Sequence, residues 1–282
     1  MAEERVPVRV GDRVLALTHL DKPWWPGFSK RDALRYYTAV TPVLVPLLAD
    51  RPASFVRAPD GVAGDRFVAK HVPPGAPEWV PRMTLEGKEG ERQQVVVDDP
   101  ATLMWAVNLG CVEFHVPQWR GDPDRHDRLV LDLDPGPGVD VIGCCAVALR
   151  LREIVAAEDG FGELRAVVSG SKGLHLYADC DALAEEPAVA AARRIAERLA
   201  EERPETVTAV MAKDRRAGRV FIDWSQNRSA KTTCSPYSLR LAHPDAPSVA
   251  CPISWDEAEA AHEPEELRFT PDQALERLDA GA

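Results

Sequence analysis

Two aspartates in the segment LVLDLDPG, Asp132 and Asp134, are well suited in type and spacing to hold a metal ion. Side chains alternate between the two faces of a β-strand, so a strand here places both carboxylates on one face. Two like charges on a core strand are costly unless a cation neutralises them, and carboxylate oxygens suit Mg²⁺ or Mn²⁺. The pair alone leaves a second interpretation open, in which one aspartate caps a turn and the other faces water.

A third acid, Asp223, follows an apolar run in VFIDWSQ. If the strands that carry Asp132 and Asp223 are neighbours in one sheet, the three carboxylates form a single site. Three carboxylates can hold two divalent ions, the arrangement that serves phosphoryl and nucleotidyl transfer. An aspartate after a strand is more often a turn residue, so only the combination indicates function.

The segment SGSKGLHLY (169–177) predicts a tight turn between two strands. Glycines 170 and 173 allow a ligand to approach the backbone closely. The polar groups of the segment suit a triphosphate: Ser169, Ser171, Lys172 and His175. An ordinary hairpin with a solvated lysine is the alternative. The segment is not a Walker A loop, because it lacks GxxxxGK[ST] and leads into a strand.

The elements around these residues follow the order β-α-β-β-α-β, which is the plan of ferredoxin-like and RNA-recognition-motif-like sheets. The expected strands are 128–134, 163–169, 173–179 and 219–225, and the expected helices are 139–160 and 186–202. Further upstream, we expect a helix over 29–48 capped by Ser29, with Pro42 and Pro46 breaking or ending it. A strand over 94–100, a helix over 100–110 and short acidic helices in 251–282 complete an α+β protein.

The charge of the chain is unevenly distributed. With 34 Lys+Arg against 45 Asp+Glu, the 282 residues carry −11, which excludes a general basic coat for nucleic acid. Residues 251–282 hold nine acids and two arginines, a net −7, whereas 213–240 hold seven basic residues and two aspartates, a net +5. A basic segment of this kind can bind polyanions on an acidic protein.

The six cysteines form no CxxC pair, which is typical of a reduced protein and predicts a cytoplasmic location. The charged N-terminus is unlike a signal peptide, and no apolar run is long enough for a membrane span.

Taken together, six ordered motifs between about residues 15 and 278 resemble the polymerase domain of bacterial DNA ligase D, in the archaeo-eukaryotic primase superfamily. They are DKPWWP, FHVPQW, LVLDLDPG, SGSKGLHLY, FIDWSQN and KTTCSPYSLR. The resemblance implies a primase-polymerase fold with an RNA-recognition-motif-like palm. It also implies one catalytic domain over 1–282, with an N-terminal module at 1–125, the palm at 126–250 and an acidic helical tail at 251–282.

The resemblance also implies roles for individual residues. Asp132, Asp134 and Asp223 would bind metal, and Ser169, Lys172 and Arg240 would hold the incoming triphosphate. His115 and His175 would line the nucleotide site, with Gln226 near the sugar or the primer end. The DNA contacts would be Arg216, Phe67 as a template platform, and Lys22 and Lys30 at a 5′-phosphate.

The implied activity is template-dependent nucleotidyl transfer that extends primers and fills gaps at double-strand breaks during Ku-dependent end joining. Two Mn²⁺ or Mg²⁺ ions and nucleoside triphosphates, preferably ribonucleotides with manganese, would serve it. Because no ligase domain is recognised in this chain, we expect a separate ligase to act in trans. We also expect the protein to be associated with the nucleoid. The alternatives are a two-metal nuclease or phosphoesterase and a non-catalytic module that bridges DNA ends.

Overall fold

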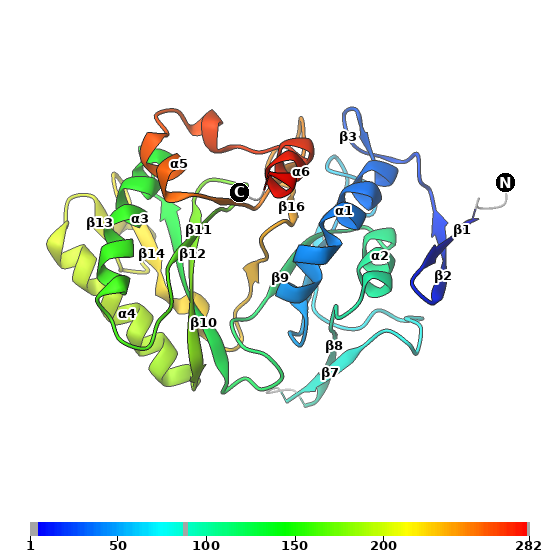
Figure 1. Ribbon diagram of the computed structural model, residues 1–282, viewed down its shortest axis with the longest axis horizontal. Helices are drawn as coiled ribbons and strands as arrows, with labels where there is room; N and C mark the ends of the chain where they lie inside the picture. The colour runs from blue at the N-terminus through cyan, green and yellow to red at the C-terminus, as the bar shows by residue number, and fades with distance from the viewer. Residues whose placement is uncertain (1–4, 87–89, 281–282) are drawn as a thin grey trace. The chain divides into compact units, whose positions relative to one another are not determined.

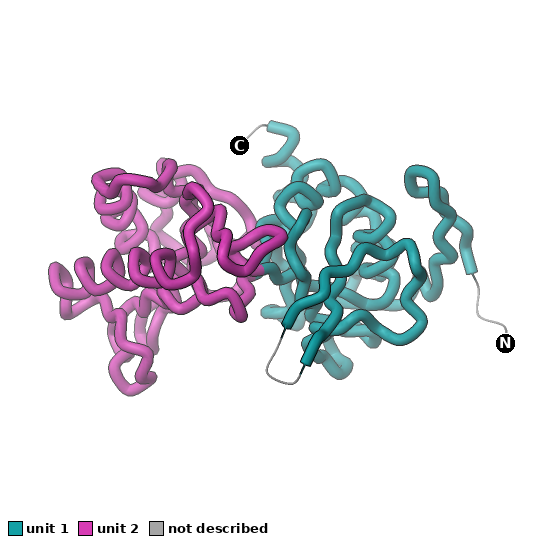
Figure 2. Tube along the Cα trace, turned by 90° about the horizontal axis from the view of Figure 1, so that it is seen from below, with its two compact units in different colours: residues 1–116, 234–249, 270–280 teal, residues 117–233, 250–269, 281–282 magenta. Residues whose placement is uncertain are grey.

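The computed structural model describes residues 5–86 and 90–280, which fall into two compact units (Figure 2). Unit 1 comprises Met1–Val116, Cys234–Val249 and Thr270–Ala280, and unit 2 comprises Pro117–Thr233, Ala250–Phe269 and Gly281–Ala282. Compact units are divisions of packing rather than of function. The single catalytic domain with its three segments therefore stays a prediction.

Unit 2 is built on a six-stranded sheet of order β13-β14-β10-β12-β11-β18. All its neighbours pair antiparallel except β13 and β14. The strands are β10 (His126–Pro135), β11 (Arg165–Val168), β12 (Leu174–Leu183), β13 (Val207–Thr208), β14 (Val220–Asp223) and β18 (Cys251–Ile253). The predicted neighbourhood of the first and last strands, β10 and β14, is confirmed.

Helices of unit 2 pack against this sheet (Figure 1). The helices α3 (Val141–Ala156) and α4 (Glu185–Glu202) contact its strands, whereas α5 (Trp255–Ala260) and the 3-10 turn η3 (Pro264–Leu267) contact α3. The 3-10 turn η2 (Trp224–Asn227) contacts β10 and α4, and the unit also holds η1 (Lys213–Arg215). Asp140 begins α3 by accepting the N–H of Ile142 at 2.9 Å. The helix was expected to reach Gly160 but ends at Ala156, four residues before this left-handed glycine.

Unit 1 contains a sheet of order β15-β9-β5-β6 and four two-stranded pairs, β1-β2, β3-β4, β7-β8 and β16-β17. The first sheet comprises β5 (Ser54–Arg57), β6 (Phe67–Ala69), β9 (Cys111–Val116) and β15 (Thr233–Cys234), where the chain re-enters the unit. The pairs are β1 (Arg5–Val10), β2 (Arg13–Thr18), β3 (Pro23–Trp25), β4 (Phe28–Ser29), β7 (Arg82–Leu85), β8 (Arg92–Val95), β16 (Leu239–Arg240) and β17 (Ser248–Val249). The strand expected over 94–100 thus begins earlier and ends at Val95.

The helices of unit 1 are α1 (Lys30–Leu48), α2 (Pro100–Asn108) and α6 (Pro271–Asp279). Ser29 caps α1 in a capping box with Asp32, as expected. The prediction that Pro42 and Pro46 break α1 is wrong, since both lie inside it. Leu44 and Leu48 are fully buried, and their packing holds the helix together beyond the first proline.

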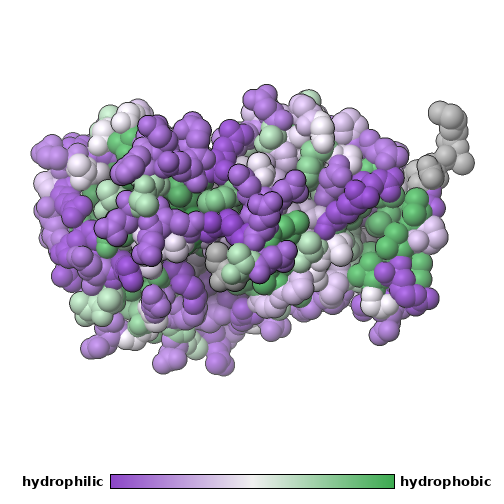
Figure 3. Space-filling model, turned by 45° about the horizontal axis from the view of Figure 1, so that its top comes forward, coloured by the Kyte–Doolittle hydropathy of each residue, from purple (hydrophilic) through white to green (hydrophobic). Residues whose placement is uncertain are grey.

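The surface is predominantly hydrophilic on the face drawn in Figure 3, with smaller apolar areas between the hydrophilic residues. Within residues 5–86 and 90–280, the large apolar side chains that are exposed are Val14, Phe67, Val68, Val210 and Met211. No helix in these ranges combines the length and the apolar character needed to cross a membrane.

Candidate active site

The sheet of unit 2 aligns three predicted site residues in one row. Asp132 on β10 lies directly opposite Asp223 on β14 and directly opposite His175 on β12. Partners directly opposite one another in a sheet point to the same face, so the three side chains are neighbours. Asp132 Oδ1 lies 3.6 Å from His175 Nε2, and both side chains are largely buried. The sequence prediction of one acidic site across two strands matches this register.

Asp223 is fixed by the turn that follows it. Its Oδ1 accepts the backbone N–H of Ser225 at 3.0 Å and the hydroxyl of the same serine, and its Oδ2 accepts Gln226 Nε2 at 3.1 Å. The amide oxygen of Gln226 is buried and has no hydrogen-bond partner among the described residues. Gln226, expected near the sugar or primer end, therefore also orients an acid of the site. The sequence reasoning missed Ser225, although a serine two residues after an aspartate is a common turn signal.

Asp134 lies two residues along β10 on the same face as Asp132, and its side chain is 53% exposed. Desolvation and the neighbouring charge of Asp223 raise the pKa of Asp134, while Arg216 opposes the rise. The rise means that the ionised form of Asp134 is disfavoured here, first by desolvation and then by the charge of Asp223. A divalent cation bound by the acids would compensate both effects, so the residues present fit the predicted metal.

Arg216, predicted to contact DNA, lies beside the acids. Its guanidinium stacks 3.7 Å from the ring centroid of Phe221, donates to the Met211 carbonyl at 2.8 Å and lies 3.9 Å from Asp134 Oδ2. The PGPG turn after β10 holds this segment, because the Gly136 N–H donates to the Arg219 carbonyl at 2.9 Å. Arg216 is thus a charge partner of the acids in this structure.

The turn between β11 and β12 is closed from inside by Ser169. Its hydroxyl oxygen accepts the N–H groups of Ser171 at 3.2 Å and Gly173 at 3.1 Å, and its own N–H donates to the Gly173 carbonyl at 2.8 Å. Ser171 and Lys172 are exposed at the tip, where a ligand can reach them. The segment predicted to bind the triphosphate is therefore a turn that exposes Lys172 and is stabilised internally by the hydrogen bonds of Ser169.

His115 and Arg240, the other predicted nucleotide contacts, belong to unit 1 and share one partner there. Glu113 Oε2 lies 2.8 Å from His115 Nε2, and Glu113 Oε1 lies 3.5 Å from Arg240 Nε. Sequence reasoning missed Glu113. The available signal was its spacing of two from His115, which places both side chains on one face of β9.

Glu113, His115 and Cys234 form a second group of metal-ligand type, with ligand atoms within 4.8 Å of one another. His115 and Arg240 already pair with the Glu113 carboxylate. Burial raises the pKa of Cys234 to about 11. A cation here would lie beside Arg240 and would have to deprotonate a buried thiol, so the acids of unit 2 fit a divalent ion better.

The predicted DNA contacts of unit 1 differ in exposure. Lys22 is partly exposed and pairs with Asp60, whereas Lys30 is 5% exposed and donates from Nζ to the Thr18 carbonyl at 2.7 Å. Phe67 is 46% exposed on the edge strand β6, with the Arg57 guanidinium 5.2 Å from its ring centroid. An exposed ring beside an arginine suits base stacking.

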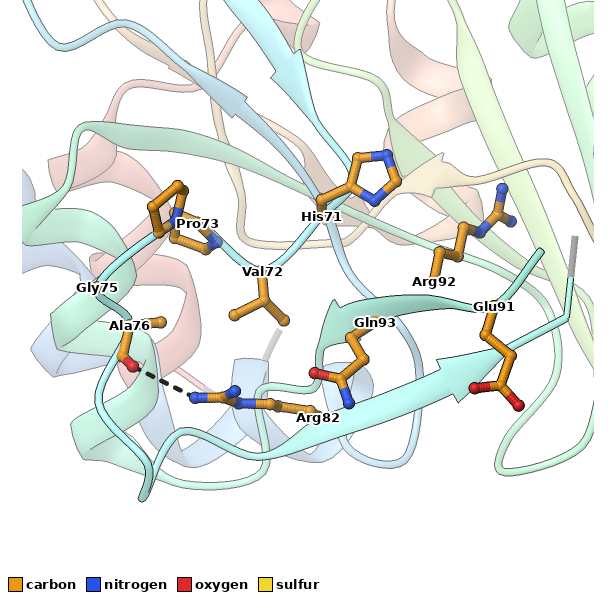
Figure 4. Close-up of a pocket in the computed structure, with 10 residues that line it drawn as sticks. His71, Val72, Pro73, Gly75, Ala76, Arg82, Glu91, Arg92 and Gln93 are labelled. Atoms are coloured by element: carbon orange, nitrogen blue, oxygen red, sulfur yellow. Dashed lines mark hydrogen bonds between the residues drawn. The ribbon is translucent and has the colours of Figure 1, made fainter. Parts of the chain in front are cut away.

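A pocket of about 470 Å³ lies in unit 1 between residues 71–76 and the β7-β8 hairpin (Figure 4). Arg82 crosses it and donates to the carbonyls of Ala76 at 3.2 Å and Pro77 at 3.0 Å. Its lining, all within the described residues, includes none of the predicted site residues. The pocket therefore lies outside the candidate active site.

Divalent metal is expected to stabilise the protein through the acids of unit 2. Saturating Mn²⁺, at about 100 times its dissociation constant, should raise the melting temperature by about 5 °C. Asp134→Asn should lose most of this increase while being at least as stable as the wild type without metal, because it removes a charge that Asp223 repels. Differential scanning fluorimetry with Mn²⁺ and with EDTA measures both effects, and an undiminished increase in the variant would exclude Asp134 as a ligand.

The sequence of this chain is similar to those of described proteins. A family model described as LigD, primase-polymerase domain, matches residues 29–282. The multifunctional non-homologous end joining protein LigD of Mycolicibacterium smegmatis is 41% identical over 269 residues, which are 93% of this chain and 34% of the relative. The bifunctional non-homologous end joining protein LigD of Bacillus subtilis is 29% identical over 253 residues, 89% of this chain and 40% of the relative. The chain thus spans about a third of the length of the first of these relatives.

A solved structure agrees with the sequence relatives. The polymerase domain from Mycobacterium tuberculosis Ligase D in complex with DNA superposes with a TM-score of 0.87 at 38% identity, over 94% of each chain. The predicted α+β primase-polymerase fold is therefore confirmed. With a family match over most of its length, this chain belongs to the LigD primase-polymerase domain family.

Proposed function

We propose that this protein is a template-dependent nucleotidyltransferase that extends primers and fills gaps at double-strand breaks during Ku-dependent end joining. The observation that carries the proposal is the row of Asp132 and Asp223, with Asp134 beside them on the same face of the sheet. Membership of the LigD primase-polymerase family supports divalent-metal dependence and nucleotidyl transfer. Mn²⁺ as the preferred ion and ribonucleotides as the preferred substrates are parts of the proposal.

In the proposed reaction, the primer 3′-oxygen attacks the α-phosphorus of a nucleoside triphosphate and pyrophosphate leaves. Asp132, Asp134 and Asp223 would hold two divalent ions, which when bound stabilise charge on the attacking and leaving oxygens. Ser225 and Gln226 keep Asp223 oriented for this role.

The remaining groups of the proposed site are cationic or neutral donors that bind phosphate oxygens. Lys172, in the turn between β11 and β12, and Arg240 offset the charge of the triphosphate. Arginine can do so through two parallel hydrogen bonds. His115 and His175 would line the nucleotide site. Ser171 adds a hydroxyl at the same turn as Lys172.

One incubation tests the proposal against its alternatives. The protein is mixed with Mn²⁺, a 5′-phosphorylated gapped or overhanging duplex and a single NTP or dNTP, and labelled strands are resolved by length. Templated extension supports the proposal. Shortening without added nucleotide identifies a nuclease or phosphoesterase, and retention of the duplex at unchanged length identifies an end-bridging module.

The proposed partners are DNA ends bearing a 5′-phosphate, nucleoside triphosphates, Ku and a ligase acting in trans. The structure of the solved relative is of a complex with DNA. The basic residues of 213–240 would contact backbone phosphates, which makes DNA affinity fall steeply with salt. A reduced cytoplasmic, nucleoid-associated location is part of the same proposal, and it is supported by the six cysteines, which form no disulfide among the described residues.

The two predicted phosphate lysines should respond differently to substitution. Lys22→Ala is expected to weaken the preference for a 5′-phosphorylated gap about tenfold, since one charge-assisted hydrogen bond is lost, with little change in stability. Lys30→Ala should lower the melting temperature as well, because Lys30 is buried and holds the Thr18 carbonyl. The two variants are distinguished by measuring the affinity of each for gapped DNA with and without the 5′-phosphate, together with its melting temperature. Equal preference in Lys22→Ala and wild type would remove Lys22 from the phosphate site.

A further inference from the structure

Glu113 is a buried carboxylate at the centre of a small polar network in unit 1. It lies on β9, and its side chain is 9% exposed. Burying an ionised carboxylate is costly unless charges and hydrogen bonds compensate it. Although burial favours the neutral acid, the hydrogen bond with His115 and the charge of Arg240 lower the pKa of Glu113 to about 2. The carboxylate is therefore ionised at neutral pH.

The two oxygens of Glu113 divide their partners between separate segments. Oε2 faces His115 Nε2 at 2.8 Å, while Oε1 accepts the Leu241 N–H at 2.8 Å and lies 3.5 Å from Arg240 Nε. Because Arg240 and Leu241 are consecutive, one oxygen holds both the backbone and the side chain of that segment. Two groups far apart in sequence, an imidazole and a guanidinium, are thereby tied to one carboxylate.

We infer that Glu113 is a positioning residue that presents His115 and Arg240 to the triphosphate of the incoming nucleotide. The inference rests on the proposed function, which makes both groups nucleotide contacts. Arg240 is 15% exposed, and without Glu113 it would lose the carboxylate oxygen that lies 3.5 Å from its Nε. The arginine would then move toward solvent, and the imidazole would lose the acceptor that fixes its ring.

The expected consequence is weaker nucleotide binding with an unchanged chemical step. The three acids proposed to carry the chemistry belong to unit 2, whereas Glu113 belongs to unit 1. A residue that contributes to binding in the ground and transition states alike changes KM and leaves kcat unchanged. Loss of Glu113 should therefore appear in KM for the nucleotide.

Glu113→Gln is the direct test, because glutamine keeps the shape and an acceptor for Leu241 while removing the charge. In single-nucleotide primer extension, we expect KM for the NTP to rise about tenfold with kcat within about threefold of wild type. Glu113→Asp, which retains the charge on a shorter side chain, should recover part of this loss. If the glutamine variant does not fold, the aspartate variant carries the test with an increase in KM of about threefold. Glu276→Gln, an exposed glutamate on α6 of the same unit, is the matched control and should behave as wild type.

A double variant separates positioning from general stability. If Glu113 acts through Arg240, Glu113→Gln combined with Arg240→Gln should raise KM little more than Arg240→Gln alone. Fully additive increases, or a Glu113→Gln variant whose KM is that of wild type while its melting temperature falls, would overturn the inference and leave the proposed function standing. A wild-type protein that extends no primer would overturn both.

Discussion

Replacement of Asp132 by asparagine is expected to lower the rate of primer extension about a thousandfold. The substitution removes one negative charge from the row of acids, and several kcal/mol of charge stabilisation at the metals would be lost with it. The fold should survive, since asparagine has the same shape and the flanking Leu131 and Leu133 keep their burial. Extension at saturating Mn²⁺ and NTP, followed over hours, measures the loss.

The control for this experiment is an aspartate elsewhere in the same sheet. Asp179 on β12 is largely exposed and pairs with Arg165. Asp179→Asn should extend primers at the wild-type rate and lose at most about 1 kcal/mol of stability, as expected for a surface ion pair. Extension by Asp132→Asn at the rate of the control would remove Asp132 from the catalytic centre and with it the proposed mechanism.

Gly173→Ala is expected to destabilise unit 2 by about 3 kcal/mol or more, the upper end of what overpacking costs. A Cβ at this position would lie 3.1 Å from Pro135 Cδ and only 1.9 Å from the Leu133 carbonyl oxygen, a backbone atom that cannot rotate away. The strand carrying His175 would have to move from the strand carrying Asp132. Chemical denaturation should therefore show lower stability, and any folded protein should extend primers poorly.

Gly162→Ala provides the comparison in the same unit. Its added Cβ would lie 3.5 Å from the Asp179 carbonyl oxygen, an ordinary contact, so its stability should stay within about 1 kcal/mol of wild type. If Gly173→Ala were as stable and active as Gly162→Ala, the close approach of the turn to β10 would not exist in solution.

The acidic site was predictable because its determinants are local in sequence. Alternation alone puts Asp132 and Asp134 on one face, and the order of elements indicated that β10 and β14 are neighbours. The exact register, which sets Asp223 opposite Asp132, depends on cross-strand packing that no single segment encodes. The same limit applies to α1, where two prolines predicted a break and the burial of Leu44 and Leu48 in the tertiary fold overrode them.

The network around Glu113 shows where sequence reasoning stops. The glutamate was recognisable as a polar residue two positions from His115 on a mostly apolar strand, but its partner Arg240 comes from a segment far away in the chain. Likewise, the basic composition of 213–240 predicted DNA contacts, but composition could not indicate that Arg216 stacks on Phe221 beside Asp134. Long-range pairings of this kind follow from the tertiary fold rather than from spacing.

The register of β10 determines both the alignment of the candidate site and the stability of the folded protein. Leu133 pairs with Ile222 on one side and with Leu174 on the other, one residue along from the row of Asp132, Asp223 and His175. A slip by one residue would separate the row and turn the leucines outward. Because chaperones and proteases act on unfolded or aggregating chains, cellular quality control would discard misaligned molecules without any test of their activity. A molecule that persists because these leucines are buried therefore also has Asp132, Asp223 and His175 in one row.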